Sequence, residues 1–361
     1  MTASLRLHDD ERPNWRTSTP FLLFHLLPLL AFATGVSVEA IVLCVGSYVV
    51  RMFFITAGYH RYFAHRSFRT SRPVQFLLAL GGTTAVQKGP LWWAGWHRRH
   101  HRHADTDRDP HSPQAGFWWS HIGWILCDKH KGWDPDSIKD FNKYPELRFL
   151  TKHDWIPPWT LAIASYFIAG WPGLIVGFFW STVLLWHGTF TVNSLAHVMG
   201  RRRYATTDTS RNSALIAAVT GGEGWHNNHH HYQASARNGF FWWEYDPTYY
   251  GLKVLSWFRI VRDLKVPPAR ILHDARVREG SFDVGMFKAH WGKATAALAA
   301  HARKADVLVD HSDDLEAATR REAIADQMHA SREALEESVR TAMRSAEELA
   351  QLSRKQRATA R

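Results

Sequence analysis

Two pairs of long apolar runs constrain this chain more than any other feature of its sequence. The first pair covers residues 21–34 and 36–57, with Gly35 between the runs and only Glu39 and Arg51 charged in the second. The second pair covers about 159–169 and 172–197 and is broken at Gly170-Trp171-Pro172. A helix needs roughly 20 residues to cross a bilayer, at about 1.5 Å per residue. We therefore expect four membrane spans, at 19–35, 36–57, 158–170 and 172–197.

The charges flanking these runs predict their orientation. The turn between the first two runs carries only Glu39, and the turn between the second two carries no charge. The opposite ends are rich in arginine: Arg6, Arg12, Arg16, Arg98, Arg99, Arg102, Arg201, Arg202 and Arg203. Because positive charge stays on the cytoplasmic side, both termini and residues 58–157 are predicted to be cytoplasmic. If the protein is bacterial, the membrane would be the plasma or inner membrane. Two apolar hairpins inside a large soluble protein are the alternative.

Whole-chain averages conceal this organisation. The 361 residues are 45% hydrophobic and their mean hydropathy is −0.30, values typical of a soluble protein. Beyond about residue 267 the composition shifts to Ala, Glu and Arg, and apolar residues recur at three- and four-residue steps. That pattern predicts a helix or short coiled coil. We therefore expect a polar segment at 1–17, a membrane domain at 18–268 and a charged helical tail at 269–361.

Histidine is the second unusual feature, with 23 in the chain. Three clusters stand at the predicted cytoplasmic ends of the spans, and they contain His60, His65, His97, His100, His101, His226, His229 and His230. The second and third clusters share the spacing i, i+3, i+4, which lies on one face of a helix. Neighbours at i+3 and i+4 are still about 100° apart, so two facing clusters can hold two metal ions.

The types of residue available narrow the choice of metal. Imidazole binds Fe, Zn, Cu and Ni. The chain has only two cysteines and no H-E-x-x-H motif, which disfavours a disulfide framework, a cysteine-based cluster and a zinc protease. Nitrogen ligands without thiolates suit iron that meets oxygen, although they do not by themselves identify the metal.

One further pair of candidate ligands ends the fourth run. His197 stands there with Asn193 one turn before it on the same face. A polar group at the end of a span is costly unless it is used, so both residues are candidates. Six other histidines are predicted to be interfacial or hydrogen-bonded: His25, His111, His121, His130, His153 and His187. His8 and the histidines after residue 270 are predicted to be solvated.

These motifs, in this order and between these runs, resemble the membrane-bound fatty-acid desaturases, and among them the acyl-CoA (stearoyl-CoA Δ9-like) desaturases. The resemblance spans about residues 20–265 and is carried by HRYFAHRSF, WHRRHHRHADTDRDPHSP, GFWWSHIGW, NSLAH and GEGWHNNHHH. It implies an all-α integral membrane protein in which four transmembrane helices form two hairpins. A cytoplasmic helical cap would hold a histidine-rich dimetal site.

The resemblance also implies a set of ligands for two iron ions. One iron would be held by His60, His65, His97, His101 and His230. The other would be held by His100, His197, His226 and His229, with Asn193 acting through a water. No side chain is expected to act as a separate acid or base, because the metal and O2 supply the chemistry.

The reaction implied is the O2-dependent formation of a cis double bond, Δ9, in a saturated fatty acyl thioester during unsaturated fatty acid biosynthesis. The resemblance points to Gln87, Trp93 and Thr189 as lining an acyl tunnel near its bend. Tyr48, about 18 Å along its helix from His60, is a candidate to close the far end. Lys88 and Lys129 are candidates to contact the phosphates of acyl-CoA. Gly95-Trp96 replaces the Arg-Asp of the animal enzymes, which leaves acyl-CoA, acyl-carrier protein and intact lipid open.

The remaining expectations concern partners and rival functions. No His-Pro-Gly-Gly, cysteine cluster or G-x-G-x-x-G is present, so the two electrons should come from a separate ferredoxin, rubredoxin or cytochrome with its NAD(P)H reductase. The net charge of +11 suits an anionic acyl carrier or the bilayer surface, and no nucleic-acid partner is expected. A related di-iron hydroxylase or ketolase is the first alternative. A histidine-rich membrane transporter or sensor is the second, although it would place ionisable groups within the spans.

Overall fold

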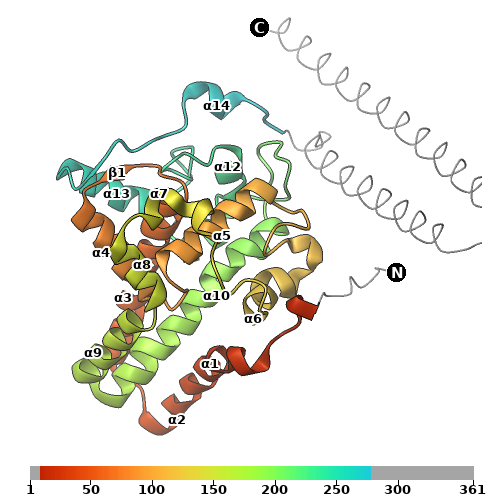
Figure 1. Ribbon diagram of the computed structural model, residues 1–361. Helices are drawn as coiled ribbons and strands as arrows, with labels where there is room; N and C mark the ends of the chain where they lie inside the picture. Colours follow the sequence, from red (N-terminus) through yellow and green to blue (C-terminus); the bar gives the residue numbers. More distant parts are fainter. Residues whose placement is uncertain (1–8, 278–361) are drawn as a thin grey trace, which may run out of the picture. The chain divides into compact units, whose positions relative to one another are not determined.

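The computed structural model describes residues 9–277, which are almost entirely helical (Figure 1). Most of the predicted tail at 269–361, and with it the predicted coiled coil, therefore lies outside the described residues. The longer α-helices are α1 (Trp15–Leu26), α3 (Val38–Phe53), α4 (Arg72–Thr83), α5 (Pro90–His103), α8 (Pro145–Lys152), α9 (Ile156–Pro172), α10 (Ser181–Asn193) and α13 (Pro247–Trp257). The shorter ones are α2 (Ala31–Thr34), α6 (Trp124–Leu126), α7 (Lys139–Asn142), α11 (Ala214–Val219), α12 (His226–His231) and α14 (Ala269–His273). Strands β1 (Arg69–Thr70) and β2 (Val261–Arg262) pair antiparallel.

Three helical segments are long and apolar enough to cross a membrane: Trp15–Thr34, Val38–Ala64 and Ile156–His197. The first two are separated where Gly35, at φ 73, ends α2, and Ser37 then caps α3 by accepting a hydrogen bond from the Ala40 amide. Both helices leave large apolar side chains uncovered; Phe32 is 93% exposed and Val42 66%. Contiguous exposed apolar surface of this kind suits contact with lipid.

The third segment is a single stretch of 42 residues where the sequence predicted two spans. Its helical geometry is interrupted at Ala169 and Gly170, and Gly170 has a φ of 61, which only glycine adopts easily. Just beyond the interruption, a Cβ on Gly173 would lie 2.2 Å from the carbonyl oxygen of Ser165. The two sides of the break are therefore in direct contact, and the break falls at the predicted Gly170.

Two π-helical segments extend the spans. The segment η3 (Phe54–Ala64) continues α3, and η7 (Gly173–Trp180) leads into α10. Such wide turns are often found at functional sites because they shift side chains out of the α-helical register. Helices α4 and α5 pack against η3, and α10 packs against α3. These contacts fix η3, which carries His60, against the helix that carries the second histidine cluster.

One buried cation ties the second and third segments together. Arg51 is 2% exposed, and its guanidinium donates to the Thr182 hydroxyl and the Ser181 hydroxyl, at 2.7 Å each. A hydrogen bond to a charged group contributes about 1.5–3 kcal/mol. Removing both acceptors would leave the charge buried with poorer partners, which costs more than removing the charge itself.

We therefore expect the double variant Ser181→Ala/Thr182→Val to lose about 3 kcal/mol of unfolding free energy. Arg51→Met should cost less, because the Thr182 hydroxyl already donates to the Phe178 carbonyl of its own helix. Thermal unfolding in detergent measures both. Thr191→Val, whose hydroxyl bonds only within its own helix, is the matched control. Greater damage from Arg51→Met than from the double variant would contradict this account.

Candidate metal centre

Nine histidines from distant parts of the chain converge on two adjacent groups. The ligand atoms of each group lie within 4.8 Å of one another. The first histidine group is His60, His65, His97, His101 and His229. The second histidine group is His100, His197, His226 and His230. These are the nine histidines that the sequence analysis singled out as ligands.

Helix geometry explains how one cluster supplies both groups. On α5, His97 and His101 are one turn apart and join the first group, whereas His100 joins the second. On α12, His229 and His230 likewise diverge. Segment η3 contributes His60 from the second apolar segment. Segment η8 (Leu195–His197) contributes His197 from the end of the third apolar segment.

The assignment of His229 and His230 is the reverse of the one that the resemblance implied. The Nε2 atom of His229 lies 2.9 Å from Nε2 of His101 and 3.0 Å from Nε2 of His60, both in the first group. The Nε2 atom of His230 lies 3.3 Å from Nε2 of His100 in the second group. The reason is the rotation of α12, which Asn227 fixes by accepting hydrogen bonds from the backbone of Arg203 and Tyr204.

Four of the histidines contact a buried carboxylate through Nδ1, whereas their Nε2 atoms face the other histidines. The Nδ1 atoms lie near carboxylate oxygens in four pairs: His60–Glu223 at 2.8 Å, His100–Asp109 at 3.0 Å, His197–Asp105 at 3.3 Å and His230–Asp208 at 2.9 Å. A carboxylate at Nδ1 retains the proton there and leaves Nε2 free to bind a metal. The sequence analysis missed these carboxylates, although three stand in acidic or histidine-rich motifs, DTDRD and GEGWH.

The donor atoms fit a bound metal. His100 and His230 each donate from Nδ1 to a carboxylate, so when both rings are neutral their Nε2 atoms, 3.3 Å apart, both present lone pairs. Two lone pairs cannot form a hydrogen bond, and a cation between them removes their repulsion. Burial, together with the neighbouring histidines, also holds the pKa of His97, His101 and His229 well below its usual value. Neutral imidazole is the form that binds metal.

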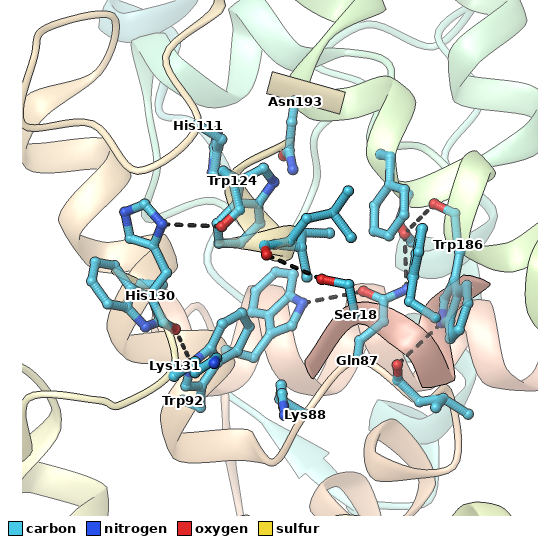
Figure 2. A pocket seen from close by; sticks show the side chains of 18 of the residues that line it. Ser18, Gln87, Lys88, Trp92, His111, Trp124, His130, Lys131, Trp186 and Asn193 are labelled. Atoms are coloured by element: carbon cyan, nitrogen blue, oxygen red, sulfur yellow. Dashed lines mark hydrogen bonds between the residues drawn. The ribbon is translucent and has the colours of Figure 1, made fainter. Parts of the chain in front are cut away.

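An apolar cavity of about 480 Å³ has Trp92, Trp124 and Trp186 in its wall (Figure 2). His97 and Asn193 are among its lining residues, and aromatic side chains line much of the rest: Phe21, Phe24, Trp92, Trp93, Trp96, Trp124, Trp186 and Phe190. Its volume is within the range of small-molecule sites. The first span contributes Phe21 and Phe24, which the sequence analysis did not single out because nothing in an apolar run distinguishes them.

Four of the six predicted substrate contacts line this cavity: Gln87, Lys88, Trp93 and Thr189. The Gln87 amide donates to the Thr189 hydroxyl at 2.8 Å and accepts from the Trp93 indole at 3.3 Å. Trp93 also stacks on His97, with ring centroids 4.9 Å apart. These bonds pair the polar side-chain atoms of Gln87, Trp93 and Thr189 with one another.

The other two predicted contacts lie elsewhere. The Tyr48 hydroxyl donates to the Val219 carbonyl at 2.6 Å, and Tyr48 is not among the lining residues. Lys129 is not among them either; its ammonium contacts the Glu11 carboxylate at 2.6 Å. Lys131, two residues further on, lines the cavity instead.

The known proteins that this chain resembles are desaturases. Residues 38–255 match the sequence model described as fatty acid desaturase. A probable acyl-CoA desaturase of Schizosaccharomyces pombe is 33% identical over 312 residues, which cover 79% of this chain and 64% of that protein. An sn-1 stearoyl-lipid 9-desaturase of Synechocystis is 38% identical over 74% of this chain and 86% of its own length. An acyl-CoA C20 Delta5-desaturase of Anemone leveillei is 37% identical over 70% of this chain and 84% of its own.

Proposed function

This chain belongs to the fatty acid desaturase family, and from that membership we propose that it forms a cis double bond, Δ9, in a saturated fatty acyl thioester. It is thus an oxidoreductase acting on fatty acyl chains. The observation that carries the finer proposal is the apolar cavity that includes His97, a member of the first histidine group, in its lining. The similarity to a stearoyl-lipid 9-desaturase over most of its length favours Δ9.

The histidine groups would each hold one iron. His60, His65, His97, His101 and His229 would hold the first, and His100, His197, His226 and His230 the second, with Asn193 facing the cavity nearby. When bound, two irons supply the oxidising power, drawn from O2 and two electrons, that an unactivated C–H bond requires. The chain's part is to orient the imidazoles through their carboxylates and to hold the acyl chain at a fixed depth.

The cavity wall is suited to an acyl chain. Because Gln87, Trp93 and Thr189 bond to one another, they offer the chain no unpaired polar atom. Lys88 and Lys131 line the same cavity. Asp154 and Asp128 contact their ammonium groups, but both lysine side chains are about half exposed and accessible to an anion beside the apolar path. That combination favours a substrate with an anionic head and an apolar tail, so we propose acyl-CoA.

The third apolar segment supports a topology of four crossings. Its 42 residues would extend roughly 63 Å as one straight helix, about twice the apolar thickness of a bilayer. The contact of Gly173 with Ser165 favours a hairpin instead. Residues 64, 156 and 197 then share one side with the histidine groups, and nearby arginines favour the cytoplasm for that side and for both termini.

The remaining proposals follow from the same motifs. We propose a membrane desaturase domain at 18–268 beneath a cytoplasmic helical cap, followed by a separate tail at 269–361. The electrons would come from an external ferredoxin, rubredoxin or cytochrome with its reductase, because the sequence carries no motif for a fused carrier.

Expression in a host that lacks unsaturated fatty acids tests the reaction. We expect new cis monoenes, with the double bond placed by mass spectrometry of derivatised chains. His100→Ala and His229→Ala should abolish them, whereas His103→Ala, on α5 but outside both histidine groups, should not. Hydroxylated or keto products would instead support the related hydroxylase or ketolase. Metal uptake without any change in acyl chains would support a transporter or sensor.

A further inference from the structure

A second cavity, of about 700 Å³, shares no lining residue with the apolar cavity. It is bordered by the strand pair β1–β2 and by the first turn of α4. Five cationic side chains line it: Arg66, Arg69, Arg72, Arg262 and Lys265. Nothing in the proposed reaction uses them.

Nearby acids neutralise only part of this charge. Arg66 pairs with Asp140 at 2.8 Å, and Arg72 makes two bonds to Glu146, at 2.7 and 2.8 Å. Asp263 is the one acid in the lining and lies 3.5 Å from Arg69, with both side chains largely exposed. Arg262 and Lys265 remain, so the cavity keeps an excess of about two positive charges.

A buried amide at the same place points to a ligand. Gln75 lines the cavity and is 4% exposed, and its oxygen accepts from the Tyr62 hydroxyl at 3.0 Å. Its Nε2 group has no hydrogen-bond partner. A buried donor without an acceptor is unfavourable, and native proteins contain few of them. An acceptor in the cavity would satisfy it.

The start of α4 adds to the attraction for anions. This helix has 12 residues, and its N-cap residue Ser71 makes no side-chain capping bond. Uncapped N–H groups and the helix dipole favour negative charge at such an end. Arginines that can make paired hydrogen bonds to one group favour an oxyanion such as phosphate.

The neighbouring surface indicates where that phosphate comes from. Just before β2, Trp257 is 69% exposed and Phe258 71% exposed. The Thr70 hydroxyl of β1 donates to the Ile260 carbonyl at 2.7 Å, which ties this apolar segment to the cavity. Exposed aromatic side chains beside cations are typical of a membrane–water interface. We propose that the second cavity binds the phosphate of an anionic phospholipid headgroup.

Binding of short-chain lipid to the full-length protein in detergent, at physiological salt, tests this proposal. The probes are dihexanoylphosphatidylglycerol, dihexanoylphosphatidylcholine and inorganic phosphate. We expect the anionic lipid to bind more tightly than the other two. Arg262→Ala/Lys265→Ala should weaken it at least tenfold, and Gln75→Leu, which changes no charge, should weaken it severalfold.

The matched control is Arg148→Ala/Lys152→Ala, which removes two exposed cations on α8, and thermal unfolding verifies that every variant is folded. The control should bind as the unmodified chain does. If lipid binding weakened equally in the control, the effect would come from the overall positive charge of the protein, and the proposed site would be wrong. Tight binding of inorganic phosphate without binding of the lipid would overturn the lipid as the ligand. Unchanged lipid binding in both cavity variants would overturn the second cavity as the site. None of these binding measurements requires the protein to desaturate a substrate. A negative result would therefore contradict the lipid site without contradicting the proposed reaction.

Discussion

A chain carrying both His101→Ala and His229→Ala is expected to keep one tightly bound metal ion, whereas His101→Ala with His230→Ala is expected to keep none. The first pair lies within one histidine group, with Nε2 atoms 2.9 Å apart, so the other group stays complete. The second pair removes one ligand from each group. Metal content per chain, measured by mass spectrometry after a chelator challenge, distinguishes the two variants. Desaturation should fall by at least about a thousandfold in both, because the two sites act as a unit.

Two further variants make this test specific. His100→Ala/His230→Ala, within the second group, should again leave one metal ion, and His103→Ala should leave two. If His101→Ala/His230→Ala kept one ion and His101→Ala/His229→Ala kept none, the partition implied by the family resemblance would be right and the present one wrong.

Replacing Arg61 should have the second largest effect. Arg61 is 1% exposed and contacts two buried carboxylates, Glu223 at 2.9 Å and Asp246 at 2.9 Å. Glu223 in turn contacts Nδ1 of His60 at 2.8 Å. Without the guanidinium, both acids would be buried without their cation, so Arg61→Met should cost about 3–5 kcal/mol and disturb the first histidine group.

Thermal unfolding and metal content together test this role. Arg66→Met is the matched control, since its ion pair with Asp140 is solvent-exposed and should contribute at most about 1 kcal/mol. Arg61→Met/Glu223→Gln/Asp246→Asn should recover part of the stability, because no uncompensated charge remains. It should not recover the first metal ion, because His60 loses its carboxylate. Full recovery of both would show that Glu223 does not position His60.

Most of the metal centre could be predicted from patterns in the sequence. Helical spacing predicted that His100 and His101 diverge, and the structure places them in different groups. It could not predict which of His229 and His230 joins which group, because that depends on how α12 is rotated by contacts to residues 203 and 204. The break at Gly170 was also predictable, because glycine and proline interrupt an apolar run there.

The missed features depend on contacts between distant residues. Tyr48 is at a suitable distance along its helix, but its hydroxyl would lie 2.7 Å from a Cβ on Gly188, and it bonds to Val219 rather than facing the cavity. Glu223 acts on His60 across more than 160 residues of chain, so no local pattern links them. Periodicity reports the face of a helix, and only packing decides what that face meets.

The buried carboxylates should make the folded protein depend on its metal supply before any catalysis. Asp105, Asp109, Asp208 and Glu223 lie behind the histidines, and Asp246 shares the guanidinium of Arg61 with Glu223. These five carboxylates and one guanidinium sum to four negative charges, which two divalent ions would balance. The loaded centre is therefore close to electroneutral, whereas the metal-free chain would bury acids that repel one another. Because a bound metal stabilises the folded state by mass action, we expect cells short of that metal, which we propose to be iron, to lose the protein itself, through degradation, as well as its activity.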